Sequence, residues 1–355
     1  MFDTSLLKYA LVAAALAAST AGVRAETIDA TIVAGHPPVF RWVKHASQTF
    51  IPAVNKALEG TGHEIKWDEQ YGGSLSKVGD ELEATEEGLA QVGVISSVFD
   101  PAKLSLQNVS YYTPFVSSDA ALVANTVDEL HSSNAAMKVT WEENGLEYLG
   151  GPSAIDDYLL MTTFPVNSID DLKGKKIGAP GPAVNWLTGS GAVGVSGNLT
   201  TYYNEIKTGV YDGVIVFATA ALPGKLYEVA PYVTKIGFGA QYAGALAANK
   251  DWYDEQPEEV QKALKAGGAA FKTAYLADLG AAQTAALKAM ADQGATITEV
   301  DDAFRQKWVA GMDNVAKTWA TQVDGEGKAG TEILKAYMDA IRAAGGKPAR
   351  NWDQE

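Results

Sequence analysis

Apolar and polar positions along the chain alternate between short strand-like runs and helix-like periods. Residues 28–34, IDATIVA, form a first apolar run that the sequence GHPP ends. Residues 40–58 carry apolar side chains at helical spacing, and two further strand-like runs at 64–70 and 91–96 flank an amphipathic helix at 78–87. This order of strands and helices predicts a parallel or mixed sheet with helices on both faces.

The stretch from Asn167 to Ala220 predicts a second unit of the same kind. Ser168 and Asp171 have capping-box spacing, and the prolines of GAPGP fall where a helix begins. Residues 214–220, VIVFATA, favour a strand that is buried on both faces. We expect the loop ends and one helix N-terminus of this unit to share a cleft.

The remaining pattern adds strands and then long helices. We predict a loop with exposed aromatic side chains at 104–115, helical sequence at 122–143, and two or three strands within 232–248. Further strands are predicted at 146–150 and 157–163, the second crossing between lobes. Alanine-rich, charge-interleaved sequence from Pro257 to Ala291 and from Asp302 to Ala344 predicts long helices with apolar faces.

The first 25 residues differ from the rest of the chain. Lys8 precedes the apolar run YALVAAALAAS, and the small-residue end VRA stops at Ala25. This order is typical of a secretory signal peptide. An N-terminal core helix is the alternative, but the run lacks helix-stop residues and is too short to cross a bilayer. We therefore predict a signal peptide at 1–25 and a mature periplasmic chain that does not insert into the membrane.

Composition excludes several function classes. The fractions of hydrophobic and charged residues, 47% and 20%, are those of an ordinary globular protein. The formal net charge of −15 argues against nucleic acid and against anionic lipid as partners. The absence of cysteine excludes disulfides, thiolate metal sites and cysteine nucleophiles.

Two patterns that resemble cofactor or metal chemistry lack the necessary context. Residues 189–194, GSGAVG, match a dinucleotide fingerprint, but they follow a predicted helix and not a strand, so a turn is favoured. The four histidines show no metal-binding spacing. His36 stands at a strand end and could reach a cleft, whereas surface positions are predicted for the other three, His45, His63 and His131. We expect no cofactor and no metal.

Catalytic chemistry is equally unsupported by the sequence. The nucleophile motifs GxSxG and SxxK do not occur. Asp156 and Asp157 are adjacent on a predicted strand and therefore face opposite ways, which favours two solvated charges over an acid–base pair. We expect a protein that is not an enzyme.

Arg41 is the strongest candidate for binding an anion. The other arginines of the mature chain, Arg305, Arg342 and Arg350, fall in the helical C-terminal third. Arg41 lies between a strand end and a helix start, where its guanidinium could hold a carboxylate. A surface arginine that stacks on Trp42 is the alternative, and both interpretations stay open.

Several longer phrases resemble the solute-binding subunit of tripartite ATP-independent periplasmic (TRAP) transporters. They are NSIDDLKGKKIGAP from Asn167, IKTGVYDG from Ile206, KLYEVAPYV from Lys225, NKDWYDEQPEEVQKAL from Asn249 and, earlier, GGSLSKVGDELEATEEGLAQVGVISS. The resemblance covers most of residues 26–320. It implies an α/β fold of two lobes, joined by crossing strands and a long helix, that closes on a small organic acid. It also implies no enzyme activity and a membrane permease as partner.

The chain departs from this family's pattern where the family binds the ligand carboxylate. Gly178 stands where an arginine is usual, Tyr158 replaces a second arginine, and Val216 replaces an asparagine. A buried polar group without a partner costs roughly 1–3 kcal/mol, so a pocket with fewer such groups favours a less polar ligand. We therefore predict an aromatic or otherwise hydrophobic monocarboxylate. A polar sugar acid or dicarboxylate, and a periplasmic sensor or enzyme with the same cleft, are the alternatives.

The predicted lobes and ligand-binding residues follow from this comparison. One lobe comprises residues 26–155 and about 236–280, and the other comprises residues 156–235 and about 281–355. The carboxylate would be held by Arg41 or by the backbone amides of Gly181–Ala183 at a helix N-terminus. Trp186 and Phe217 could equally be core residues, and Ser96 or Ser97 could simply end a strand. The predicted ligand-binding residues are His36, Phe40, Arg41, Ser96, Ser97, Tyr158, Asn185, Trp186, Val216 and Phe217.

Overall fold

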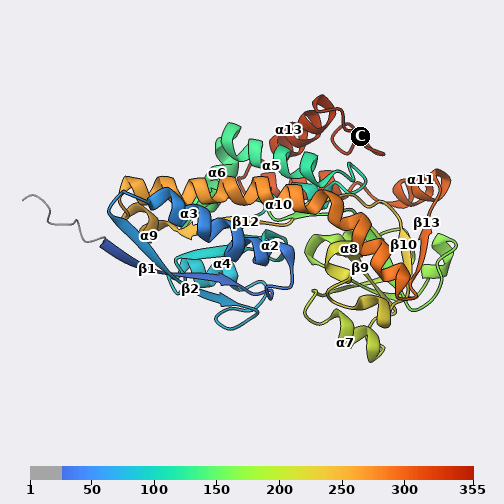
Figure 1. Ribbon diagram of the computed structural model, residues 1–355. Coiled ribbons are helices and arrows are strands. Elements are labelled where there is room, and N and C mark those ends of the chain that lie inside the picture. The colour runs from blue at the N-terminus through green and yellow to red at the C-terminus, as the bar shows by residue number, and fades with distance from the viewer. Residues whose placement is uncertain (1–25) are drawn as a thin grey trace, which may run out of the picture.

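The computed structural model describes residues 26–355 and contains two mixed β-sheets covered by helices (Figure 1). The predicted signal peptide lies outside the described residues. In the first sheet, β1 pairs in parallel with β2 and β3, and β12 runs antiparallel to β3 and β4. The strand order is β2 (His63–Tyr71), β1 (Glu26–Ala34), β3 (Val92–Ile95), β12 (Ala245–Asn249), β4 (Leu146–Gly150).

The second sheet is built from the middle of the chain and one late strand. Antiparallel β6 lies between β10 and β9, while β7 pairs in parallel with both β9 and β8. The strand order is β13 (Thr296–Glu299), β10 (Tyr232–Lys235), β6 (Tyr158–Thr162), β9 (Gly213–Phe217), β7 (Lys176–Ala179), β8 (Val193–Ser196). The predicted α/β fold is confirmed.

Two features connect the sheets. The short strands β5 (Ala154–Ile155) and β11 (Gln241–Tyr242) pair antiparallel where the chain crosses between the sheets. Helix α10 (Glu258–Asp292) has 35 residues and packs on α3 and β4 at one end and on α8 and β13 at the other (Figure 1). Crossing strands and a long helix were both expected. The division into lobes by residue number stays a proposal.

The remaining helices are short. The first helical segment contains a π-helical turn at Ala46–Phe50 between α2 and α3, and 3₁₀ turns at Leu106–Tyr112 and Gly181–Leu187 pack against each other. The α-helices are α2 (Arg41–His45), α3 (Ile51–Leu58), α4 (Glu81–Glu86), α5 (Ala120–Ser133), α6 (Ala135–Glu142), α7 (Tyr202–Lys207), α8 (Ala218–Ala221), α9 (Lys250–Asp254), α11 (Asp302–Gly311), α12 (Val315–Gly325) and α13 (Gly330–Ala343).

The Asn167–Ala220 stretch differs from its prediction at two places. The segment GSGAVG was predicted as a turn, but its last two residues begin strand β8, Val193–Ser196. The capping box of Ser168 and Asp171 is present. The apolar run from Val214, however, is a strand only as far as Phe217, and Ala218–Ala221 turn into α8. The continuous run of β-branched and aromatic residues stops at Phe217, and three of the four residues that follow are alanines, which favour helix.

Two predictions of surface exposure were wrong. The predicted loop with exposed aromatics is a 3₁₀ turn in which Tyr111 is 1% exposed, and Phe115 beyond it is also buried. His131 is buried as well, because its Nδ1 donates to the carbonyl of Val127 and its Nε2 accepts from Trp141, while its ring stacks on Tyr148. A satisfied imidazole packs as a core residue.

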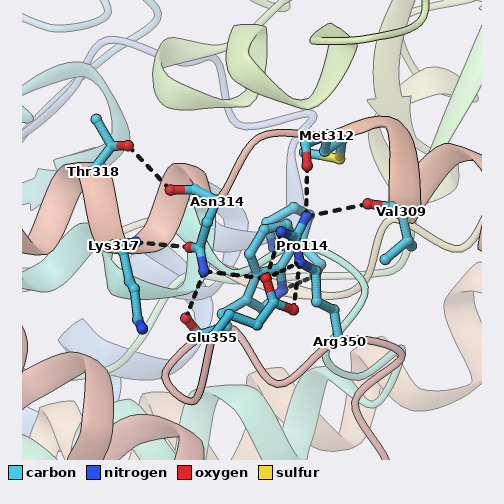
Figure 2. A network of polar contacts seen from close by, with 9 residues as sticks. Pro114, Val309, Met312, Asn314, Lys317, Thr318, Arg350 and Glu355 are labelled. Carbon is cyan, nitrogen blue, oxygen red and sulfur yellow. Dashed lines mark hydrogen bonds and ion pairs between the residues drawn. The ribbon is translucent and has the colours of Figure 1, made fainter.

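The C-terminal tail is fixed to the helices before it (Figure 2). Arg350 donates to the carbonyls of Val309 and Met312 and pairs with Glu355. Trp352 is completely buried, and its indole N–H donates to the carbonyl of Pro114. The end of the chain therefore belongs to the folded core.

Within residues 26–355, none of the helices combines the length and the apolar character needed to cross a membrane.

Candidate functional site

A buried cavity lies where the two sheets face each other. His36 and Ser96 follow the carboxyl ends of β1 and β3 in the first sheet, and Pro180 and Phe217 stand at the carboxyl ends of β7 and β9 in the second. Ligands of open α/β sheets bind outside the carboxyl ends of the strands. Ser153, Ile155 and Ala243, on the crossing segment, close the cavity from behind.

The lining is largely aromatic and aliphatic. The empty space between these side chains, counted together with the open solvent at its mouth, is about 480 Å³. It is lined by His36, Trp42, Ser96, Val98, Phe99, Tyr111, Ser153, Ile155, Tyr158, Pro180, Leu199, Tyr202, Ile215, Val216, Phe217 and Ala243.

The rings at this cavity contact one another across the two sheets. Trp42 of α2 stacks on Phe40 with ring centroids 5.0 Å apart, and it also contacts Phe217 of β9 at 6.0 Å. Tyr158 packs edge-on against Phe217 at 5.2 Å. Such offset and edge-to-face pairs each contribute about 0.5–1.5 kcal/mol beyond the area they bury. The aromatic contact between Trp42 and Phe217 therefore helps to hold the two sheets together around the cavity.

A few polar atoms at the cavity have no partner in the protein. His36 Nε2, Ser153 Oγ and Tyr202 Oη are buried without a hydrogen bond. Tyr111 and Tyr158 satisfy each other through a 2.8 Å hydrogen bond between their hydroxyls. Since buried polar groups are normally paired, the three unpaired atoms are the groups that a ligand would satisfy. Burial lowers the pKa of His36 to about 3, so its imidazole is neutral in the empty cavity.

The structure brings together half of the predicted ligand-binding residues. His36, Ser96, Tyr158, Val216 and Phe217 all line the cavity. Phe40, Ser97 and Trp186 are buried but stand outside the lining, Phe40 behind Trp42 and Trp186 stacked on Tyr111. Asn185 is exposed on the Gly181–Leu187 turn.

Arg41 is held on the outside of the molecule. Its guanidinium pairs with Asp278 of α10, and His45 Nε2 lies 3.3 Å from the same carboxylate. The side chain borders a surface groove with Lys44 and Thr219. Among residues 26–355, no lysine or arginine lines the central cavity.

The other predicted anion site, the backbone amides of Gly181–Ala183, is tightly packed against the rest of the protein. A Cβ on Gly181 would lie 2.1 Å from the carbonyl oxygen of Val98, so this backbone turn is pressed against the 3₁₀ turn that follows β3. The amide of Ala183 donates to the carbonyl of Pro180 within its own turn. Gly178, where an arginine was expected from the family's pattern, has no room for a side chain, since its Cβ would meet the ring of Tyr211 at 2.9 Å.

Several lining residues were missed by sequence reasoning. Trp42, Phe99 and Tyr111 are three of them, and the others include Leu199, from the loop after β8, and Tyr202, the first residue of α7. Trp42 and Phe99 each lie in the segment that follows a strand of the first sheet. This position after a strand end could have identified them as candidates for the cavity. Nothing in the local sequence of Leu199 or Tyr202 distinguishes them from ordinary core residues.

The prediction that Asp156 and Asp157 are solvated charges was wrong. Asp156 is 2% exposed and accepts hydrogen bonds from the backbone and the hydroxyl of Thr219. Asp157 is partly buried and accepts from the amide of Gly239 at 2.8 Å. Each carboxylate thus ties the crossing segment to a different neighbour. Burial raises the pKa of both carboxyls to about 6.

Replacing Asp156 by asparagine should change how stability depends on pH. The pKa of Asp156 is higher in the folded protein than the ordinary 3.8, so between about pH 4 and 6 the folded state binds more protons than the unfolded state. Its contribution therefore falls as pH rises through this window, by up to about 1.4 kcal/mol per pH unit. Asp156→Asn should lack this decline.

Urea unfolding of both proteins at several pH values from 4 to 7 measures the difference. The free energy of unfolding of Asp156→Asn, relative to the parent, should increase as pH rises. A difference that stays constant over this range would show that Asp156 does not titrate as described.

Comparison with known proteins gives the family. The family model DctP, described as bacterial extracellular solute-binding protein, family 7, matches residues 42–322. No curated protein matches the chain.

Solved structures share the fold at low sequence identity. A marine metagenome TRAP solute-binding protein, described as specific for aromatic acid ligands and bound to 3-hydroxybenzoate, aligns with TM-score 0.79 and 20% identity over 89% of this chain and 98% of that one. A TRAP solute-binding protein from Rhodoferax ferrireducens T118 in complex with benzoate aligns with TM-score 0.76 and 17% identity, over 90% of this chain and 98% of that one. A TRAP periplasmic solute-binding protein from Sulfitobacter sp. NAS-14.1 with bound β-D-galacturonate aligns with TM-score 0.74 and 22% identity, over 88% of this chain and 100% of that one.

The confirmed fold thus matches the resemblance stated from the sequence, as does the periplasmic location that such proteins have. The chain belongs to family 7 of the bacterial extracellular solute-binding proteins and has the two-lobed fold of TRAP periplasmic solute-binding proteins.

Proposed function

We propose that this protein captures a small aromatic or otherwise hydrophobic monocarboxylate in the periplasm and delivers it to a TRAP membrane permease. The single observation that carries the proposal is the cavity between the sheets, whose lining consists almost entirely of aromatic and aliphatic side chains. Small-molecule sites are typically concave and mostly apolar with a few well-placed polar groups, and this lining has that character.

The lining favours a ring over a polyol. Faces and edges of Trp42, Tyr158 and Phe217 surround the void, and each ring can add a stacking contact to a planar ligand. A sugar acid brings several hydroxyls, and each would lose its water without a partner at a cost of roughly 1–3 kcal/mol. Two of the solved structures of this fold hold aromatic acids, which supports the same choice, although another holds galacturonate.

Capture follows from closure of the two lobes. A ligand shifts the equilibrium toward the closed form only by as much as it prefers that form. A ligand in this cavity would contact residues of both sheets, such as Trp42 from one and Phe217 from the other, and would therefore favour closure. Binding without turnover agrees with a family of solute-binding proteins.

A thermal-shift screen tests the proposal. Benzoate, 3-hydroxybenzoate and cinnamate should raise the melting temperature, while succinate and galacturonate should not. A ligand at about 100 times its dissociation constant should add roughly 2.7 kcal/mol of stability. The variant Arg41→Ala should bind the aromatic acids within about twofold of the parent, since exposed ion pairs contribute little and Arg41 faces Asp278.

Two results would contradict the proposal. Stabilisation by sugar acids or dicarboxylates alone would assign the cavity to a polar ligand. Loss of aromatic-acid binding in Arg41→Ala, with Lys44→Ala unaffected, would show that the surface arginine moves into the site.

A further inference from the structure

Among the described residues, His36 is the one side chain lining the cavity that can carry a positive charge. It follows β1 by two residues and is 4% exposed. Its ring packs edge-on against Phe40 and Trp42, at 5.6 and 5.2 Å, and lies 6.3 Å from Phe99. Its Nε2 is buried without a hydrogen-bond partner. This nitrogen can accept a proton and can donate to an anion once protonated.

An ionised carboxylate would be unstable alone in this cavity. The lining holds hydroxyls and aromatic faces but, among the described residues, no lysine or arginine. A buried anion needs an opposite charge or several hydrogen bonds, and otherwise it takes up a proton. Buried carboxyls on adjoining segments make the need greater. Glu81 accepts from the amide of Gly35, next to His36, and Asp156 follows the lining residue Ile155.

Resting on the proposed function, we propose that the cavity binds its carboxylate together with one proton, which His36 Nε2 takes up and donates to the ligand in a hydrogen bond. The bound pair is then electrically neutral as a whole. The ligand neither gains nor loses a covalent bond, and the proton comes from solvent. The cavity therefore discriminates against any ligand that brings a second charge, such as a dicarboxylate.

Other titratable groups near His36 could also take up a proton, and the test has to distinguish them from His36. The carboxylate of Glu81 accepts from the amides of Gly35 and Gly79, and burial raises its pKa to about 7. Burial also raises the pKa of Asp100, beside Phe99, to about 6. The tyrosines at the cavity, Tyr111, Tyr158 and Tyr202, have pKa values raised by burial and stay neutral. The amide of Gly72 donates to the backbone carbonyl of His36, and burial also raises the pKa of the preceding residue, Tyr71.

The expected sign is tighter binding at lower pH. The free imidazole is neutral and the free acid is ionised above about pH 5, so binding adds one proton to the complex. The dissociation constant should then rise about tenfold per pH unit, from about pH 5 up to the pKa of His36 in the complex. Above that pKa the dependence should level off.

Calorimetry with benzoate and benzamide tests this inference. Titrations of benzoate at pH 5.5, 6.5 and 7.5, each in two buffers of different ionisation enthalpy, should show uptake of about one proton per ligand and the tenfold dependence at the lower pH values. Benzamide, which is uncharged, should bind without proton uptake. In His36→Gln, which keeps a polar side chain but does not titrate, benzoate should bind more weakly at pH 5.5 and lose the pH dependence.

Control variants show which side chain takes up the proton when benzoate binds. Glu81→Gln and Asp100→Asn should keep the dependence of the parent, and His36→Gln should remain folded by circular dichroism. Equal affinity for benzoate at all three pH values would overturn the inference and leave the proposed function intact. Proton uptake that persists in His36→Gln, or disappears in Glu81→Gln or Asp100→Asn, would also overturn it. If no aromatic acid binds at any pH, the proposed function fails together with it.

Discussion

Replacing Gly268 by alanine should destabilise the protein by about 2 kcal/mol, within the range of about 1–3 kcal/mol expected when a packed site is overfilled. Gly268 lies in the middle of α10 and is buried against β4. A Cβ at this position would stand 1.9 Å from the carbonyl oxygen of Leu149. That oxygen belongs to a strand backbone and cannot turn aside, so the helix itself would have to move. The loss should exceed the higher helix propensity of alanine, which is about 1 kcal/mol.

Gly280 provides a matched control on the same helix. It is exposed, about three turns further on, and a Cβ there would meet nothing within 4 Å. Gly280→Ala should therefore stabilise the protein by about 0.5–1 kcal/mol through helix propensity alone. Urea unfolding of the two variants should give changes of opposite sign. Equal effects at both positions would show that the approach of α10 to β4 does not constrain the fold.

Local patterns predicted the elements of this fold well. The alanine-rich sequence after Pro257 became α10, and the capping box at Ser168 formed as its spacing predicted. Both depend on residues a few positions apart, where backbone geometry alone decides the outcome. The end of β9 at Phe217 was misplaced because an apolar run does not itself distinguish strand from helix.

Burial of polar residues could not be predicted in the same way. Asp156 and His131 became core residues because their hydrogen-bond partners, Thr219 and Trp141, are brought to them by the tertiary fold. Asp156 and Thr219 are 63 residues apart in sequence. A prediction that uses only neighbouring positions in the sequence treats such a carboxylate as solvent-exposed. It fails for Asp156, because the partner that lets this carboxylate be buried lies far away in the sequence.

The candidate site shows the same division between local and distant information. Residues at strand ends, such as His36, Ser96 and Phe217, were predicted, because the carboxyl ends of strands in α/β sheets form ligand clefts. Tyr202, at the start of α7, and Ala243, between β11 and β12, reach the cavity from segments whose position depends on the whole fold. Arg41 was chosen for its charge, and the structure gives that charge a partner on α10.

Replacing Ala243 by phenylalanine should abolish most ligand binding while the protein stays folded. Ala243 lines the cavity from the crossing segment, where its amide donates to Ser153 and its carbonyl accepts from Val98. These backbone contacts hold its Cα in place, so a larger side chain at this position must occupy the cavity. The added ring would then take the space and the aromatic contacts that the ligand uses.

The magnitude follows from the cost of overfilling a packed site. Forcing a ligand in beside the new ring should cost about 1–3 kcal/mol, which is roughly a 5- to 150-fold increase in the dissociation constant for aromatic acids. Ala243→Ser, which adds little volume, should bind within a few-fold of the parent. Calorimetry with benzoate measures both constants, and the ligand-free melting temperature shows whether Ala243→Phe is folded. Unchanged affinity in a folded Ala243→Phe would place the ligand outside this cavity, because two rings cannot share the space that one of them fills.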